Sequence, residues 1–260
     1  MNPNWIGLLS SVLAFGAFFY AFRLSVKTGI RRRLFLATLA CALAIPGLSF
    51  TFHYFHLVPE WDWYFEFRSL PGTELLLVMI GAAGGFAAAV LPRGLLVFPL
   101  MGVAVLVTVP FIKPFIGPIS DGALKDQWIE GICLQSTPST CGAASLATIL
   151  KSLGINAKES ELAVEAHSYT GGTEAWYLAR CARSRGMDVR FDFSQGFDQD
   201  APLPAMVGVR VGSIGHFIPI IERKGDSFLT GDPLHGGEWM TLDELLRRYQ
   251  FTGFRMEVSR

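Results

Sequence analysis

Hydrophobic positions are distributed in two different ways along the 260 residues of this chain. The first part contains four long apolar runs without charged residues, at residues 5–22, 34–50, 75–91 and 95–112. A helix needs about 20 predominantly apolar residues to cross the hydrocarbon core of a bilayer. The pattern therefore predicts an all-α bundle of about four transmembrane helices, in a membrane domain formed by residues 1–119.

An alternative interpretation of these runs is a set of buried core helices in a large soluble protein. Four runs in series, with only short or aromatic-rich connections between them, favour the membrane interpretation. The first run lacks a basic region before it and an Ala-x-Ala-like end, so we expect a retained helix rather than a cleaved signal peptide. In the third run, Gly81, Gly84 and Gly85 would let helices pack closely together.

The connection after the fourth run contains several helix-breaking residues. Pro110, Pro114 and Pro118 are expected to end the fourth helix near residue 112 and to form a linker. After about residue 120 the apolar runs become shorter and their period changes. Helical spacing begins at Cys141 and stops before Gly154.

The rest of this second part predicts two more helices and then a series of strands. The helices are expected at residues 160–167 and 174–185. Strands are expected at residues 189–193, 205–211, 217–223, 228–231 and 254–258. Thr241 and Glu244 form a capping-box pattern for a last helix that runs through Tyr249. Helices followed by antiparallel strands predict an α+β domain over residues 120–260.

The composition agrees with a membrane protein, since 51% of the residues are hydrophobic. The net charge is zero, but residues 1–119 carry an excess of basic side chains and residues 120–260 an excess of acidic ones. Neither part has a basic patch with interleaved aromatic residues. Nucleic acid is therefore not expected as a partner, whereas the lipid bilayer is.

The basic residues also predict an orientation in the membrane. Five of them lie between the first and second runs, namely Arg23, Lys27, Arg31, Arg32 and Arg33, and Arg93 lies between the third and fourth. Loops rich in Lys and Arg stay in the cytoplasm. We therefore expect an integral cytoplasmic-membrane protein with both termini outside, so that residues 120–260 form an extracytoplasmic domain.

Between the second and third runs lies an acidic segment dense in aromatic residues, residues 51–68. This composition fits an interfacial segment on the outer side, with Trp and Tyr at the depth of the lipid headgroups. His53 and His56, with Glu60 and Asp62, are an alternative metal site. Their spacing matches none of the strong zinc signatures, so we expect neither a metal nor a cofactor.

The clearest candidate for chemistry is Cys141, because it opens a helix. Unpaired backbone N–H groups and the positive end of the helix dipole stabilise a thiolate there. The Cys141 N–H points to where a tetrahedral oxyanion would form. Gln135, six residues upstream on a loop that contains Pro138, can supply a second donor to that oxyanion. By itself, Cys141 could equally be a small buried residue at the start of a helix.

Two downstream residues favour the catalytic interpretation. His216 starts an apolar run that is typical of a buried strand, and Asp232 ends the next such run. Adjacent antiparallel strands can hold an imidazole and a carboxylate side by side. His216 would then act as general base and acid, and Asp232 would orient its ring. Taken alone, His216 could be a core histidine and Asp232 the first residue of a turn.

The order of these residues and the short sequence motifs around them resemble those of a known family. The matching pieces are Gln135 six before Cys141-Gly142, Gly172-Thr173 before a helix, Pro-Leu-Pro-Ala at residues 202–205, Gly215-His216-Phe217, and Asp232-Pro233. From about residue 131 onward the chain resembles the papain-like cysteine peptidase domain of bacteriocin-exporting ABC transporters, which removes double-glycine leaders. Thr140 stands where those domains carry an acidic residue.

The resemblance implies a papain-like fold with Cys141, His216, Asp232 and the oxyanion-hole residue Gln135 as the catalytic residues. The function expected from it is limited proteolysis of a peptide or secreted protein after small residues such as Gly-Gly. The substrate is then the main partner, and export machinery is a further one. Two alternatives are a thiol-dependent amide or acyl transferase, and a non-catalytic module that binds leader peptides.

The other three cysteines have separate interpretations. Cys41 lies inside a predicted membrane span and is expected to be a packing residue. Cys133 and Cys181 both fall in the second domain, where an extracytoplasmic location would permit a disulfide between them. Two separate buried thiols are the alternative, since the sequence gives no distance between them.

Overall fold

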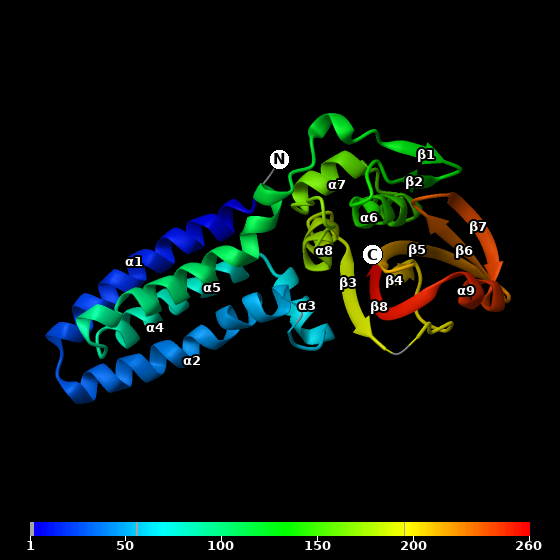
Figure 1. Ribbon diagram of the computed structural model, residues 1–260. Helices are drawn as coiled ribbons and strands as arrows, with labels where there is room; N and C mark the ends of the chain where they lie inside the picture. Colours follow the sequence, from blue (N-terminus) through cyan, green and yellow to red (C-terminus); the bar gives the residue numbers. More distant parts are fainter. Residues whose placement is uncertain (1–2, 56, 195) are drawn as a thin grey trace. The chain divides into compact units, whose positions relative to one another are not determined.

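The structure is a computed structural model that describes residues 3–55, 57–194 and 196–260. It divides into two compact units (Figure 1). The helical unit contains residues 3–59 and 71–113, and the sheet unit contains residues 60–70 and 114–260, apart from the positions just excluded. Each unit has its own arrangement of apolar residues.

The helical unit is built from α1 (Trp5–Lys27), α2 (Ile30–Tyr54), α4 (Leu77–Ala88) and most of α5 (Val97–Ile116). A 3-10 turn, η1 (Thr73–Leu76), leads into α4. Three of the described helices, α1, α2 and α5, are long and apolar enough to cross a membrane. They correspond to the first, second and fourth predicted spans.

The third predicted span is shorter than its apolar run. A helix rises about 1.5 Å per residue, so the 12 residues of α4 cover about 18 Å, against about 30 Å for a hydrocarbon core. A fourth span is reached only if α3 (Asp62–Ser69), η1 and α4 are taken together as one broken span. The expected end of the fourth helix near residue 112 is wrong, since α5 continues through Pro110 and Pro114 to Ile116.

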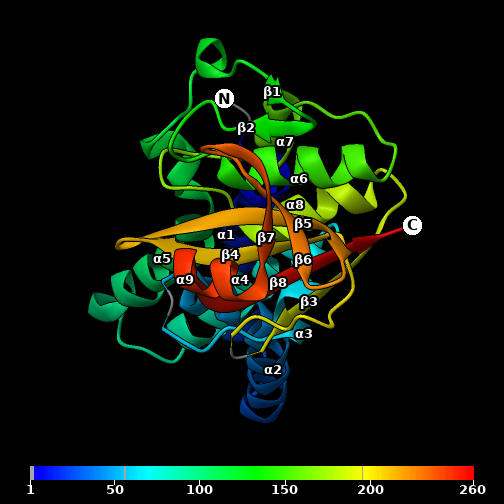
Figure 2. The ribbon, with the colours of Figure 1, turned by 90° about the vertical axis from the view of Figure 1, so that its right-hand side faces the viewer.

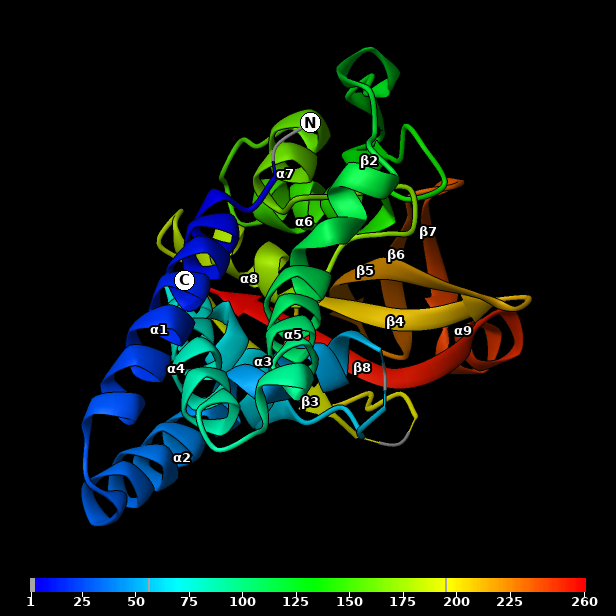
Figure 3. The same cartoon turned by 60° about the vertical axis from the view of Figure 1, so that its left-hand side comes forward.

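Close packing in the helical unit depends on glycine, as expected from Gly81, Gly84 and Gly85. Figure 3 shows α1 and α4 side by side. A Cβ on Gly81 would lie 1.8 Å from the carbonyl oxygen of Ala14, and one on Gly85 would lie 2.2 Å from that of Phe18. Any side chain at these two positions would force α1 and α4 apart, so the predicted role of the glycines is confirmed.

The sheet unit begins with a short hairpin, β1 (Gln127–Ile129) and β2 (Ile132–Leu134), which the sequence pattern did not reveal. Three helices follow. They are α6 (Cys141–Ser152), α7 (Glu159–Glu165) and α8 (Ala175–Arg183). All three were predicted, with ends that differ by a few residues. Figure 2 shows α6 lying along β5, the strand against which it packs.

An antiparallel sheet of six strands completes this unit, in the order β3-β8-β4-β5-β6-β7. The strands are β3 (Asp188–Phe193), β4 (Ala205–Val211), β5 (Ile214–Lys224), β6 (Ser227–Asp232), β7 (Gly236–Thr241) and β8 (Gln250–Ser259). Five of them were predicted, and β7 was missed. Helix α9 (Leu242–Arg248) begins with the predicted capping box of Thr241 and Glu244.

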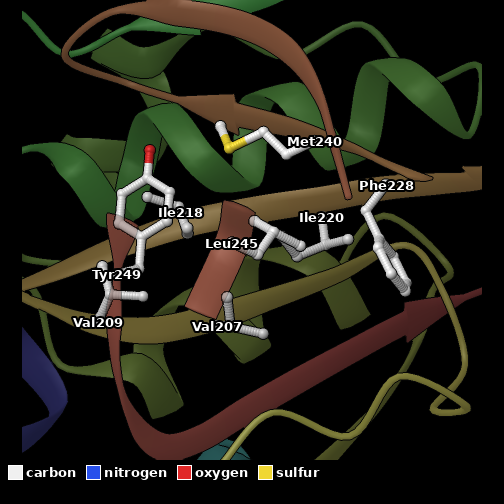
Figure 4. Close-up of a cluster of buried hydrophobic side chains, with 8 residues drawn as sticks. All are labelled: Val207, Val209, Ile218, Ile220, Phe228, Met240, Leu245 and Tyr249. Carbon is white, nitrogen blue, oxygen red and sulfur yellow. The ribbon is translucent and has the colours of Figure 1, made fainter. Parts of the chain in front are cut away.

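A compact apolar cluster lies between the sheet and α9 (Figure 4). Its members are Val207, Val209, Ile218, Ile220, Phe228, Met240, Leu245 and Tyr249. Tyr249 contributes its ring to the cluster, and its hydroxyl points out of it. The cluster fixes β4, β5 and β6, which carry the candidate residues, as one rigid layer.

Helix α3 belongs to the sheet unit although it lies between two membrane runs in the sequence. Phe65 packs among four aromatic side chains, those of Trp176, Phe191, Phe193 and Phe254. Glu66 pairs with Arg183 and accepts the backbone N–H of Phe191. Tyr64 and Phe65 are therefore buried in protein, and the expectation that the Trp and Tyr residues of this segment lie at the depth of the lipid headgroups is wrong for Tyr64.

Candidate active site

Cys141 is the first residue of α6 and its side chain is almost fully buried. Thr140, just before it, makes no side-chain capping bond to the helix. Instead, its hydroxyl accepts a hydrogen bond from the Thr137 N–H at 3.1 Å and donates to the Thr137 carbonyl at 3.1 Å. The first N–H groups of a helix have no partner within the helix, so the N-terminus of α6 keeps its donors available beside the thiol.

The start of α6 lies against the start of β5. A Cβ on Gly142 would lie 2.8 Å from a methyl group of Leu178 and 3.3 Å from the ring of Phe217, so neighbouring side chains pack closely against this glycine. Ser145, one turn later, donates its hydroxyl to the Phe217 carbonyl at 3.0 Å. These contacts place the Cys141 thiol close enough to the His216 imidazole to contribute to the raised pKa of that imidazole.

His216 on β5 and Asp232 on β6 lie side by side, an arrangement that the sequence pattern allowed. The distance between His216 Nε2 and Asp232 Oδ1 is 2.9 Å, and both side chains are buried. With Nε2–H donating to the carboxylate, Nδ1 is the ring nitrogen that is left for a proton transfer with the thiol. Asp232 also accepts the Leu234 N–H at 2.9 Å and the Tyr249 hydroxyl at 2.9 Å.

These contacts set the charges of the pair. Burial alone would lower the pKa of His216, but its hydrogen bonds with Asp232 and Cys141 outweigh burial and raise that pKa to about 9. Burial alone would raise the pKa of Asp232, but the donors from His216, Leu234 and Tyr249 lower it. At neutral pH the site therefore favours an imidazolium next to an ionised carboxylate.

Gln135 lies on the loop between β2 and α6, and both its backbone and its side chain are held. Its N–H donates to the Pro233 carbonyl at 2.9 Å, directly after Asp232. Its side-chain nitrogen donates to the Thr137 carbonyl at 2.8 Å, whereas its side-chain oxygen has no hydrogen-bond partner among the described residues. The amide nitrogen carries a second hydrogen, which is the one that can serve an oxyanion.

A buried carboxylate supports this loop. Glu159, which is fully buried, accepts the N–H of Ser136 at 2.7 Å and also the Ser136 hydroxyl. Neither Glu159 nor Tyr249 was a candidate from the sequence. An acidic residue at a helix start and a tyrosine after a capped helix have ordinary structural explanations, so only their contacts reveal that they support the site.

Cys133 and Cys181 are free, buried thiols, so the structure has no disulfide between them. Burial is the main cause that raises the pKa of each to about 12, which keeps both thiols protonated at neutral pH. No cluster of three or more His, Cys, Asp or Glu side chains suited to a metal occurs in the part of the chain that the structure describes. His56, of the alternative metal set, lies outside the described residues.

Helices packed on an antiparallel sheet, with a cysteine at a helix start facing a histidine on the sheet, define a papain-like fold. Residues 130–260 match the model of the Peptidase C39 family. This match covers half of the chain, and the chain belongs to that family.

Relatives and solved structures were found for the same part of the chain. An uncharacterised protein of Methanothermobacter marburgensis is 32% identical over 110 residues, which are 41% of this chain and 74% of the relative. A second, from Methanothermobacter thermautotrophicus, is 31% identical over 134 residues, which are 50% of this chain and 89% of the relative.

Among solved structures, the peptidase domain of Streptococcus ComA, a bi-functional ABC transporter of a quorum-sensing pathway, is 22% identical, with a TM-score of 0.42, over 48% of this chain and 95% of that chain. A double-glycine-motif protease from an AMS/PCAT transporter, solved with its leader peptide, is 22% identical, with a TM-score of 0.43, over 55% of this chain and 97% of that chain.

Proposed function

We propose that this protein is a membrane-anchored cysteine peptidase in which Cys141 is the nucleophile, His216 the general base and acid, and Asp232 the residue that orients His216. The observation that carries the proposal is the buried, hydrogen-bonded pair of His216 and Asp232 beside Cys141, which begins helix α6. A module that only binds leader peptides needs no imidazole paired with a buried carboxylate beside a thiol.

The reaction proceeds in two steps. The Cys141 sulfur forms a bond to the scissile carbonyl carbon, and the negative charge that develops on the carbonyl oxygen is stabilised by the Cys141 N–H and the Gln135 amide. The C–N bond then breaks, and His216 gives its proton to the leaving amine. In the second step His216 takes a proton from water, the hydroxide forms the acid product, and the C–S bond breaks to restore the thiolate.

The expected substrate is a peptide or secreted protein with small residues, Gly-Gly above all, before the scissile bond. This preference is what the family resemblance implies, and the double-glycine-motif protease among the solved structures supports it as a proposal. The proposed anchor consists of α1, α2 and α5, with the sheet unit outside the cytoplasm because Arg23–Arg33 mark an inner loop.

The test uses the detergent-solubilised full chain and a series of peptides that differ only in the two residues before the intended cleavage point. We expect Gly-Gly peptides to be cut faster than Leu-Leu or Arg-Arg peptides. Mass analysis with an added amine separates hydrolysis from acyl transfer, because transfer leaves the amine on the product. Equal rates for all pairs would reject the Gly-Gly preference.

Thiol alkylation supplies a second readout. In a Cys41→Ala background, the neutral thiols of Cys133 and Cys181 should react slowly, because their pKa values are about 12. Loss of cleavage should then follow the incorporation of one label at Cys141. Full activity after complete labelling of Cys141 would reject the peptidase mechanism.

A further inference from the structure

The hairpin between β4 and β5 carries two exposed apolar side chains next to the candidate active site. The chain turns at Gly212, whose φ is +63°, and Val211 pairs directly with Ile214 on either side of the turn. Val211 is 46% exposed and Ile214 is 69% exposed. The hairpin projects from the sheet at the left of Figure 2.

Strand register puts these two side chains on the same face as His216. Successive side chains in a strand point to opposite faces, so Ile214, His216 and Ile218 share one face of β5. Val209 pairs with His216 and Val211 pairs with Ile214, so Val209 and Val211 share that face on β4. Val209 and Ile218 are fully buried, and His216 is 7% exposed. The face that is buried at Val209 and Ile218 is therefore exposed to solvent beyond His216, at Val211 and Ile214.

The chemistry of the proposed reaction decides which part of a substrate lies on this side. His216 must reach the nitrogen that leaves, at a hydrogen-bond distance of about 3 Å. The segment after the scissile bond therefore starts at His216. Two residues of a strand cover about 6.6 Å, and each residue of an extended substrate covers at most about 3.6 Å. A leaving segment that runs along β5 toward the hairpin therefore has its second residue at the level of Ile214.

We propose that Val211 and Ile214 form an apolar subsite for the side chain of the second residue after the cleaved bond. The expected substrates are peptides whose new N-terminal segment carries an apolar residue such as Leu or Ile at that position. This inference rests on the proposed peptidase function and adds a requirement on the side of the bond opposite to the Gly-Gly pair.

The test compares peptides that share Gly-Gly before the bond and differ only at the second residue after it, as Leu, Ser or Lys. The solubilised full chain should cut the Leu peptide about 10-fold faster in kcat/KM than the Ser peptide, which is the usual effect of one apolar side chain in a pocket. The double variant Val211→Ser with Ile214→Ser should cut both peptides at equal rates, with a raised KM for the Leu peptide.

Two further variants make the result specific. Arg210→Ala changes the same hairpin on its other face and should keep the preference for Leu. Ile214→Glu should reverse it in favour of the Lys peptide, a gain that a damaged fold cannot produce. Equal rates for the three peptides with the wild-type chain would overturn the subsite and leave the peptidase intact.

Two other outcomes would reject the subsite for different reasons. If the wild-type chain cuts none of the peptides and Cys141 is not alkylated, the proposed peptidase function is wrong. The proposed subsite is then rejected as well. If the double variant loses activity equally on all peptides, and only in lipid vesicles, the hairpin contacts the bilayer instead of the substrate, and the subsite is overturned.

Discussion

The two sides of the candidate site differ in how completely their polar groups are paired. On the base side, the Asp232 carboxylate accepts hydrogen bonds from the His216 ring, the Leu234 N–H and the Tyr249 hydroxyl, each at 2.9 Å. These groups lie next to a rigid apolar layer. On the oxyanion side, the Gln135 amide donates to the carbonyl of Thr137 in its own loop, and its oxygen has no described partner. The hydrogen bonds of the base side are already formed without substrate. On the oxyanion side, the Gln135 amide can still form a further hydrogen bond.

This difference follows from the elements that carry each side. His216 and Asp232 lie on β5 and β6, which are neighbouring strands of one sheet, and their side chains are hydrogen-bonded. Gln135 lies on a loop whose geometry depends on the hydroxyl of Thr140 and on the buried carboxylate of Glu159. Loops that are held by a few side chains can adjust when a charge develops, and strands in a packed sheet cannot. Substitutions on the two sides should therefore have effects of different size and kind.

The largest effect should come from removing the nucleophile or the base. Cys141→Ala and His216→Ala should each reduce kcat by on the order of 10⁶-fold, because the two act as a unit. The double variant should lose no more than either single variant. The measurement is cleavage of a Gly-Gly peptide by the solubilised chain, with thermal unfolding as the check that the fold persists.

Cys41→Ala is the matched control for the thiol, since it removes an exposed cysteine from the helical unit. It should retain full activity. Substantial cleavage by Cys141→Ala would place the chemistry elsewhere in the molecule.

A smaller effect is expected on the oxyanion side. Gln135→Ala should reduce kcat by roughly 10²- to 10³-fold with little change in KM, because the donor acts on charge that appears in the transition state. Gln135→Glu keeps the size of the side chain but replaces the donor by a negative charge, so it should be at least as harmful. Glu159→Gln tests the loop instead, and it should lower both thermal stability and kcat. Near-normal turnover in Gln135→Ala would assign the second donor to another group.

The same contrast explains what could be predicted from the sequence. Strands and helices in the sheet unit follow periodic patterns, so β3, β4, β5, β6, β8 and α6 to α9 were all expected. Cys141, His216 and Asp232 were selected because Cys141 begins a helix, because His216 and Asp232 lie on consecutive predicted strands, and because the motifs around them resemble those of the family. In the structure, the side chains of His216 and Asp232 are hydrogen-bonded.

Elements without such patterns were missed. Strands β1, β2 and β7 are short or rich in glycine and polar residues, and their pairing depends on distant partners. The segment around Phe65 has the composition of a membrane interface, and only the aromatic pocket formed by Trp176, Phe193 and their neighbours reveals its place. Tyr249 was expected at the end of a helix, but its hydrogen bond to Asp232 depends on a fold that brings β8 beside β4.

The smallest effect is expected at Tyr249, where Tyr249→Phe removes one donor and keeps the ring in its apolar cluster. Asp232 keeps His216 and Leu234, so kcat should fall only several-fold. A lost hydrogen bond of this kind costs about 1 kcal/mol, which should appear as a decrease of a few degrees in Tm. Tyr177→Phe removes a hydroxyl elsewhere in the sheet unit and serves as the control.

The decisive readout for Tyr249→Phe is the pH dependence of stability. Asp232 has a lowered pKa in the folded chain, so its contribution to stability is present above its usual pKa of 3.8 and is lost as the pH falls through the folded value. Without the Tyr249 donor the folded pKa should rise toward 3.8, so the acid-side loss of stability should be smaller in total and should end at a higher pH than in the wild-type chain. His216 has a raised pKa of about 9, so its contribution is fully present below 6.5 and is lost as the pH rises through about 9. Because the Tyr249 hydroxyl donates to the Asp232 carboxylate, this alkaline limb of the Tm profile should move less than the acid limb. A shift of the alkaline limb alone would show that the hydroxyl acts on His216 and that Asp232 is held by its other donors.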